Sequence, residues 1–332
     1  MNLGYVTEIL NKKNRFVIAE LGSNHNGELG LAKLLIESAA NSGADAVKLQ
    51  LFTAEDLVSP SHSAFDQIRS LEVSFDRFIE LRAFAKAQNI ELFASAFNYA
   101  ALEFLIDQNV FALKIASSEA VNLQALAKYA KTNIPIFISF GMTEWYEVEM
   151  AMSQLMVFGK EDIIPFHCIA NYPLKVEDAN LQTIRGLASR FGGVIGFSDH
   201  TMSLEIGSWA FSMGASIFEK HITLDKRSIG PDHSYALEPN EFKTYINFIN
   251  QFQSSIGSHC KKYSESEIAG RGRLGTFAKV SLSAGSQLKY ENIEIRGPRL
   301  GIPSNIVANF IGAKIKNNVK AGKPISFSDL DI

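Results

Sequence analysis

Short apolar runs rich in β-branched and aromatic residues recur at regular intervals through the first 225 residues of the chain. Each run is five to seven residues long, which is the length of a buried strand rather than of a helix. Their nearly continuous hydrophobicity is typical of parallel strands that are covered on both faces. The eight predicted strands span residues 16–20, 46–52, 91–97, 112–117, 135–141, 163–168, 193–198 and 216–222.

Segments with helical spacing separate these runs. Leu31, Leu35 and Ala39 recur at steps of four, and Gly43 suits the left-handed residue that ends many helices. A second predicted helix begins after Ser74, a residue type that caps helix N-termini. Eight strand–helix repeats within about 250 residues predict an α/β protein with a (β/α)8 TIM barrel. An open doubly wound sheet also alternates strands with helices, but it does not require eight repeats.

The pattern changes after the predicted barrel. Residues 252–277 are polar and have no clear period, which is typical of a linker. Beyond them, the sequence AGSQLKYENIEI at 284–295 recurs as AGKPISFSDLDI at 321–332, which predicts two equivalent strand–turn units. We therefore expect a barrel domain over 1–255, a linker over 256–277 and a small β-rich domain over 278–332. So small a domain is expected to dock against another surface.

Composition narrows the classes of function. The net charge of −3, with both signs interspersed, gives no reason to expect a nucleic-acid partner. The two cysteines, Cys168 and Cys260, cannot form a disulfide framework, and their spacing fits no zinc motif. No stretch has the pattern of a signal peptide or of a membrane span, so we expect a cytoplasmic protein without membrane contacts.

Polar residues gather at the carboxyl ends of the predicted strands, the face that carries the active site in barrels of this kind. They are Glu20, Lys48, Gln50, Ser95, Lys114, Ser117, Ser139, His167, Ser198, His200 and His221. A lysine within an apolar strand is costly unless an anion compensates it. Lys48 and Lys114 therefore indicate either a phosphate or carboxylate site, or two structural ion pairs across the barrel.

His200 and His221 end two neighbouring predicted strands, so their imidazoles could bind one metal ion and leave positions open for substrate. Glu20 is a candidate for proton transfer or for orienting a sugar hydroxyl, or it pairs with one of the lysines. The polar run RSIGPDHSYALEP at 227–239 follows the last predicted strand and indicates an active-site loop with Asp232 and His233 as candidates.

Six ordered motifs make the chain resemble the sialic acid (nonulosonic acid) synthases: IAELGSNHNGELGLAKLLIESAANSGADAVKLQLF, LKIASSE, HCIANYPL, IGFSDHT, FEKHITLD and GPDHSYALEP. The resemblance covers nearly the whole chain, because the tail is similar to the family's antifreeze-like SAF module. It implies a metal-dependent condensation of phosphoenolpyruvate with an N-acetylated hexosamine, which gives a nine-carbon α-keto acid and phosphate. N-acetylneuraminate synthesis is the expected form of this reaction, and legionaminic or pseudaminic acid synthesis is the alternative.

The resemblance also implies roles for individual residues. His200 and His221 would bind a divalent metal, usually Mn²⁺ in this family. Phosphoenolpyruvate would be held by Lys48, Ser95, Lys114, Ser117, Ser139 and Ser198. The sugar would contact Glu20, Gln50, Tyr172 and Asp232. Glu20, Lys48, Lys114 and Asp232 are the predicted catalytic residues, with Glu20 transferring a proton at the sugar end.

The family's domain-swapped homodimer is also implied, with the SAF module of one subunit reaching the sugar site of the other. An Arg-Pro pair makes this contact in the family. Here the segment reads RGPRLG, so that Gly297 occupies the arginine's place and Arg296 and Arg299 flank it as candidates.

Two other classes of protein remain as alternatives. A metal-dependent hydrolase on the same barrel would use His200 and His221 with a carboxylate to activate water. Such enzymes often have a His-x-His pair on an early strand, where this chain has AELGS and AVKLQ. A carbohydrate-binding protein without activity would have little use for both histidines and both lysines.

Overall fold

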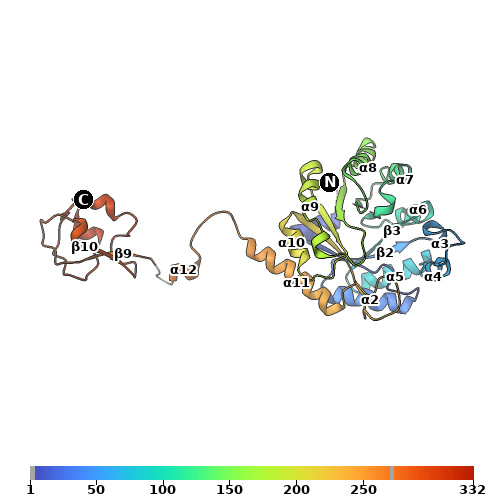
Figure 1. The fold of residues 1–332 in the computed structure, drawn as a ribbon, viewed down its shortest axis with the longest axis horizontal. Helices are drawn as coiled ribbons and strands as arrows, with labels where there is room; N and C mark the ends of the chain where they lie inside the picture. Colours follow the sequence, from blue (N-terminus) through green and yellow to red (C-terminus); the bar gives the residue numbers. More distant parts are fainter. Residues whose placement is uncertain (1–3, 270–272) are drawn as a thin grey trace. The chain divides into compact units, whose positions relative to one another are not determined.

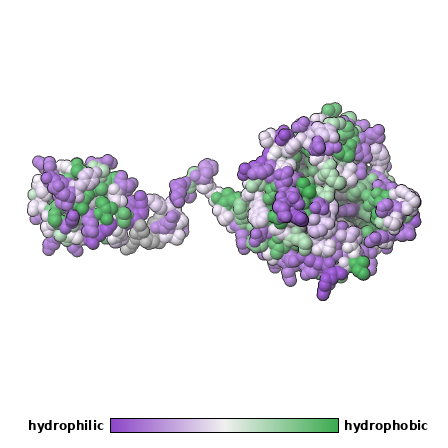
Figure 2. All heavy atoms as spheres, viewed as in Figure 1, coloured by the Kyte–Doolittle hydropathy of each residue, from purple (hydrophilic) through white to green (hydrophobic). Residues whose placement is uncertain are grey.

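The protein forms two compact units, Met1–Gly257 and Ser258–Ile332, in a computed structural model that describes residues 4–269 and 273–332 (Figure 1). Each unit has a hydrophobic core of its own. No helix in these described residues is long and apolar enough to cross a membrane. Polar side chains cover much of the face of both units that Figure 2 presents.

Eight parallel strands close into a barrel in the first unit, with β1 pairing to β8. The predicted TIM barrel is therefore confirmed, and the open doubly wound sheet is excluded. The strands are β1 (Phe16–Glu20), β2 (Ala46–Leu51), β3 (Glu91–Ala96), β4 (Leu113–Ile115), β5 (Ile136–Ser139), β6 (Ile163–Cys168), β7 (Ile195–Asp199) and β8 (Ala215–His221).

Helices lie around the strands, as Figure 1 shows. They are α1 (Gly4–Lys13), α2 (Leu29–Ser42), α3 (Ala54–Leu57), α4 (Phe65–Arg69), α5 (Phe75–Ala87), α6 (Tyr99–Asp107), α7 (Leu123–Tyr129), α8 (Trp145–Val157), α9 (Gln182–Phe191), α10 (Ile206–Ser212) and α11 (Pro239–Ile256). The predicted helix ends are confirmed: Gly43 ends α2 with a φ of 91°, and the Ser74 hydroxyl accepts a hydrogen bond from the Arg77 amide at the start of α5.

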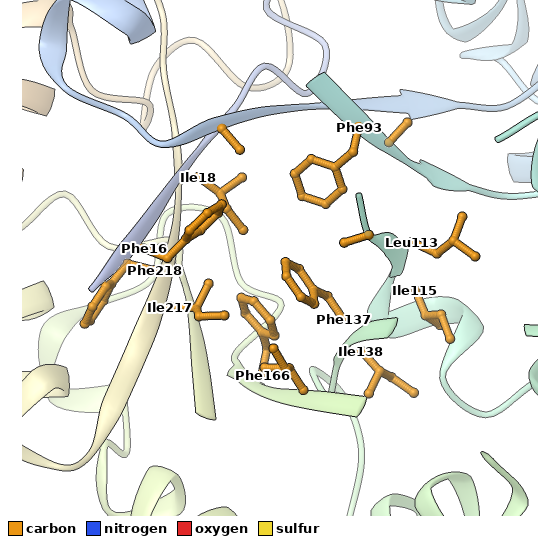
Figure 3. Packing of buried hydrophobic residues seen from close by; sticks show 14 of the residues in the cluster. Phe16, Ile18, Phe93, Leu113, Ile115, Phe137, Ile138, Phe166, Ile217 and Phe218 are labelled. Carbon is orange, nitrogen blue, oxygen red and sulfur yellow. The ribbon is translucent and has the colours of Figure 1, made fainter. Parts of the chain in front are cut away.

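Phenylalanine side chains pack together inside the barrel, where Figure 3 shows Phe93, Phe137 and Phe166 near one another. The ring centroids of Phe93 and Phe137 lie 5.9 Å apart, and those of Phe137 and Phe166 lie 5.5 Å apart. Tyr5 of α1 packs edge-on against Phe16 at 5.9 Å. Interior positions nearer the amino ends of the strands are apolar, such as Phe16 and Ile18 before Glu20 on β1, and the polar interior residues follow toward the carboxyl ends.

The internal repeat of the second unit forms two copies of one local fold. A glycine with positive φ, Gly285 or Gly322, begins each copy, and a short 3-10 helix and a strand follow. Leu282 and Val319, displaced by the same 37 residues, exchange backbone hydrogen bonds of 2.8 and 2.9 Å with each other. Pairing between equivalent residues means that an approximate two-fold axis passes between them.

The strands of this unit are β9 (Gly275–Ala278), β10 (Ile293–Arg296), β11 (Lys314–Ile315) and β12 (Leu330–Asp331). Strand β9 begins three residues before the predicted domain start at 278 and lies partly in the predicted linker, 256–277. A short helix, α12 (Glu265–Ala269), also lies in that range. Strand β9 has four residues and α12 has five, which is too short for either to produce a recognisable period.

Candidate active site

The polar residues at the carboxyl end of the barrel come from alternate positions of neighbouring strands. Side chains on a strand alternate between its two faces, so Glu20 lies on the same interior face as Phe16 and Ile18. In the register of the parallel strands, Glu20 pairs with Lys48 on β2 and with His221 on β8. The structure brings together the predicted strand-end residues Glu20, Lys48, Gln50, Ser95, Lys114, Ser139, Ser198, His200 and His221, and all but Gln50 are buried.

Two carboxylates compensate the two interior lysines. Lys48 Nζ lies 2.7 Å from Glu20 Oε2 and 3.7 Å from Glu219 Oε1. Lys114 Nζ lies 2.6 Å from Glu219 Oε2 and 4.6 Å from the ring centre of Phe166. The interpretation of the lysines as ion-paired is thus correct for the geometry, and Glu20 does pair with one of them. The cluster holds two positive and up to two negative charges.

Burial and charge act in opposite directions on this cluster. Burial raises the pKa of Glu20 above its ordinary value, although Lys48 opposes the shift. Burial also acts to raise the pKa of Glu219, but Lys114 and Lys48 outweigh it and lower this pKa to about 2. Glu219 is therefore the firm counter-charge of the lysines, and Glu20 is the carboxyl group that can hold a proton.

Hydroxyl groups border the lysines. Ser95 Oγ accepts a hydrogen bond of 3.3 Å from Lys48, and Ser198 Oγ donates one of 3.1 Å to Glu219. Ser117 Oγ accepts from the Gly141 amide at 2.9 Å. Ser139 Oγ is buried and has no hydrogen-bond partner among the described residues. A buried hydroxyl without a partner is unfavourable, so Ser139 has hydrogen-bonding capacity available for a ligand.

The two strand-end histidines face each other, with ring centroids 5.7 Å apart. His200 Nδ1 lies 2.8 Å from the backbone oxygen of Ile169, and the Cys168 thiol interacts with the same imidazole. His221 Nδ1 is buried and has no hydrogen-bond partner in the part of the chain that the structure describes. Burial lowers the pKa of His221, so this imidazole is neutral at pH 7.

These features fit a divalent metal. Metal-binding histidines are commonly neutral and use their second nitrogen to bond a backbone oxygen, as His200 does. Gly22 lies so close to His221 that an added Cβ would approach the imidazole to 2.9 Å. Among the described residues, no three His, Cys, Asp or Glu side chains form a complete metal site, so substrate or water would supply further ligands.

The loop after β8 joins the loop after β1 beside these histidines. Asp232 Oδ2 accepts hydrogen bonds from the Ser23 amide at 2.9 Å and from its hydroxyl at 2.8 Å. The same oxygen lies 4.0 Å from His221 Nδ1. Tyr235 donates a 2.6 Å hydrogen bond to Asp232 Oδ1. The predicted active-site loop therefore reaches the histidines through Asp232.

His233, the other candidate of this loop, has a structural role. Its two ring nitrogens lie 2.7 Å from Thr223 Oγ1 and 3.2 Å from Asn26 Oδ1. Through the contact with Asn26, His233 links the loop after β8 to the loop after β1.

Gln50 and Tyr172 line the same end of the barrel. Gln50 Nε2 donates a 2.7 Å hydrogen bond to Glu20 Oε1, as expected from its position two residues after Lys48 on one strand face. Tyr172 is half exposed, and its ring centroid lies 4.2 Å from that of His200. A polar, partly open wall formed by these two side chains suits a hydroxylated ligand.

Arg296 and Arg299 belong to the second unit. The Arg296 guanidinium lies over the ring of Phe277, 4.5 Å from its centroid, and donates a 3.0 Å hydrogen bond to the Gly322 oxygen. Arg299 follows the Gly297–Pro298 peptide and is exposed. Their role at a sugar site stays a prediction.

Sequence reasoning missed Glu219 and misplaced His167. Glu219 lies two residues before His221, so strand alternation could have placed it in the interior. His167 lies between the interior residues Phe166 and Cys168 and therefore faces outward, where Nε2 contacts the Ala179 oxygen at 2.7 Å. His167 is therefore not part of the strand-end layer, contrary to the prediction.

The whole chain is also similar to known proteins. Residues 35–261 match the model of the NeuB family. The N,N'-diacetyllegionaminic acid synthase of Legionella pneumophila is 33% identical over 336 residues, which cover 95% of this chain and 94% of that protein. The enzyme of the same name from Campylobacter jejuni is 35% identical over 326 residues, with 93% and 98% covered.

A solved structure gives the same result. The crystal structure of N-acetylneuraminic acid (sialic acid) synthetase from Leptospira borgpetersenii in complex with citrate has a TM-score of 0.73 and 32% sequence identity. The match covers 77% of this chain and 90% of that one. The chain described here belongs to the NeuB family of sialic acid-type synthases.

Proposed function

We propose that the protein condenses phosphoenolpyruvate with an N-acetylated hexosamine and releases a nine-carbon sialic acid-type α-keto acid and phosphate. The observation that carries this proposal is the pair of buried lysines, bordered by serine hydroxyls, at the same end of the barrel as two facing histidines. Membership of a synthase family argues against the metal-dependent hydrolase and against a binding protein without activity.

Phosphoenolpyruvate requires cations and hydrogen-bond donors for two anionic groups. Lys48 and Lys114 supply the cations, and Ser95, Ser117, Ser139 and Ser198 supply hydroxyls. The lysines are neutralised by Glu20 and Glu219 in the free protein, so the ligand must compete with these carboxylates. Glu20 is the carboxylate that would release its lysine, because its pKa is raised and protonation would remove its negative charge when the anion binds.

The reaction then needs correct positioning of two substrates. A bond forms between C3 of phosphoenolpyruvate and the aldehyde carbon of the open-chain sugar. The aldehyde oxygen takes a proton and becomes a hydroxyl. Water adds to C2, and phosphate leaves from the resulting tetrahedral carbon, which becomes the ketone. Fixed lysines and hydroxyls hold the phosphoenolpyruvate and stabilise its charge, and such preorganised electrostatics supplies much of the acceleration in enzymes.

Glu20 is the proposed proton donor to the aldehyde oxygen. Its Oε1 bonds Gln50 on the side of the lysines, and it pairs in register with His221 on the other side. Gln50, Tyr172 and Asp232 would orient the sugar from the open end of the barrel. A divalent cation, most simply Mn²⁺, held by His200 and His221 would act as a Lewis acid that polarises the aldehyde.

The acceptor is proposed to be of the N-acetylmannosamine type. N-acetylmannosamine itself would lead to a neuraminic acid, and its 4-acetamido-6-deoxy relative would lead to a legionaminic acid. The names of the two relatives from Legionella and Campylobacter support the second of these. The altrose analogue, which leads to a pseudaminic acid, is the third member of the series.

Phosphate release tests this proposal directly. The protein would be incubated with phosphoenolpyruvate, Mn²⁺ and each of the three sugars in turn. Phosphate should appear with at least one sugar, and omission of the sugar or treatment with a chelator should stop it. Absence of phosphate with all three sugars would contradict the synthase function. His200→Ala should abolish metal-dependent turnover while far-UV circular dichroism stays unchanged.

A homodimer exchanged through the second unit is also proposed. Residues 258–332 hold 12 lysine and arginine residues against 6 acidic ones. The segments between each barrel strand and the following main helix hold 13 acidic residues against 4 basic ones. Opposite charge supports docking of the second unit of one copy at the carboxyl end of the barrel of another, where Arg296 or Arg299 would approach the sugar.

A further inference from the structure

A buried ion pair lies directly behind the two facing histidines. Asp199 and Lys220 are register partners on β7 and β8, and their side chains point to the outer face of the barrel wall. Asp199 Oδ2 lies 2.8 Å from Lys220 Nζ, and both side chains are at most 1% exposed. Each residue immediately precedes one of the histidines, His200 or His221.

The pair fixes the backbone around His200. Asp199 Oδ1 accepts a 2.8 Å hydrogen bond from the Thr201 amide, and Lys220 Nζ donates to the Thr201 oxygen. His200, which lies between Asp199 and Thr201, therefore has its backbone fixed on both sides by the ion pair. His221 follows Lys220 directly, so the same pair also links the backbone positions of the two histidines.

Packing alone does not explain this choice of residues. Taking two charges out of water costs free energy that their attraction often does not recover, and apolar replacements of a buried pair are often neutral or stabilising. Lys220 Nζ lies 5.7 Å from the ring centre of the buried Tyr245 on α11, and Asp199 interacts with the hydroxyl of the same tyrosine. What apolar side chains could not supply is the directional bonding to both peptide groups of the Thr201 turn.

We propose that Asp199 and Lys220 are positioning residues that hold His200 and His221 at the separation required to bind one divalent cation. This inference rests on the cation site of the proposed function. Neither residue touches substrate or cation. Their effect passes through the backbone of the two strand ends.

The test is direct measurement of Mn²⁺ binding without substrates, by the loss of the free-ion electron paramagnetic resonance signal on titration. The informative variant replaces both charges at once, Asp199→Leu with Lys220→Met, because a single replacement would leave an unpaired buried charge. Arg15→Met is the matched control. It removes a buried 2.8 Å ion pair with Asp45 at the opposite end of the strands, where Lys13 still contacts Asp45.

The double variant should remain folded in circular dichroism and bind Mn²⁺ about 10-fold more weakly, which is the lower end of the loss found when residues that orient metal ligands are replaced. Arg15→Met should be less stable to urea yet bind Mn²⁺ within about twofold of the unchanged protein. Equal Mn²⁺ affinity of the double variant and the unchanged protein would overturn the positioning role. If the unchanged protein and His200→Ala bind Mn²⁺ equally weakly, the cation site itself is wrong and this inference falls with it.

Discussion

Glu219 forms ion pairs with both lysines of the barrel interior, so its replacement should lower the free energy of unfolding. Replacing it by Gln removes the negative charge that lies 2.6 Å from Lys114. Breaking a buried pair from one side typically costs about 3 kcal/mol of unfolding free energy or more. Urea unfolding should show this loss. Glu80→Gln, which breaks an exposed 2.6 Å pair with Lys33, should cost less than about 1 kcal/mol.

The same variant tests the proposed phosphoenolpyruvate site. An anion bound between Lys48 and Lys114 would supply part of the charge that Glu219→Gln removes. Saturating phosphoenolpyruvate should therefore raise the urea midpoint of the variant by more than it raises that of the unchanged protein. Equal stabilisation of the two proteins would place the ligand elsewhere.

His25 provides a pH-dependent contribution to stability. Burial lowers its pKa from 6.5 to about 4, and its Nδ1 accepts a hydrogen bond from the Gly27 amide. The unfolded chain therefore binds a proton more readily than the folded one between these two pH values. Stability is unaffected above about pH 6.5 and falls as the pH drops to 4, by about 3 kcal/mol at most for a shift of this size.

His25→Asn should remove this dependence, because the Asn oxygen can also accept the Gly27 amide hydrogen and does not titrate. The difference in urea midpoint between the two proteins is measured at pH 7 and at pH 5. Its change with pH gives the contribution of His25 to stability, because all other titrating groups are the same in both proteins. A difference that does not change with pH would show that His25 is protonated in the folded state.

At the scale of elements, the sequence predicted the positions of the strands better than it predicted which side chains face the barrel interior. All eight strands were recognisable because each apolar run is bounded by a helix with its own spacing. Lys48 and Gln50 were correctly assigned to one face because they are two residues apart. Strands that are apolar on both faces do not reveal which face is interior, and this is why His167 was placed wrongly. The contribution of Glu219 required knowledge of what lies across the barrel.

Helix α2 offers a paired test of the capping argument. Gly43 has a φ of 91°, so Gly43→Ala should destabilise the protein by about 1 kcal/mol through strain at its left-handed position. Gly30 lies near the start of the same helix, and an added Cβ there would meet no described atom within 4 Å. Gly30→Ala should therefore stabilise the protein by about 0.5 kcal/mol. Urea unfolding of both variants measures the two effects, and the same sign for both would contradict the assignment.

At the scale of the whole molecule, the second unit has little core and strong positive charge. Most of its hydrophobic cluster consists of residues paired by the 37-residue repeat, to which the intervening segment adds Ile302 and Val307, and each copy alone would leave its apolar side chains in water. The sequence repeat made this pairing foreseeable. The docking roles of Arg296 and Arg299 stay predictions, because a docking surface has no periodicity of its own.

Charge then makes the assembly testable. If the basic second unit of each copy docks at the acidic strand-end loops of the other, the chain should sediment as a dimer at micromolar concentration in low salt. Screening weakens attraction between exposed charges, so the dimer dissociation constant should rise between 0.05 and about 0.5 M NaCl.

Arg299→Glu should weaken the dimer further, while Arg227→Glu, on the acidic barrel loops, should not weaken it. A monomer at all salt concentrations would exclude the exchanged dimer, and a dimer insensitive to salt would show that another, apolar surface joins the subunits.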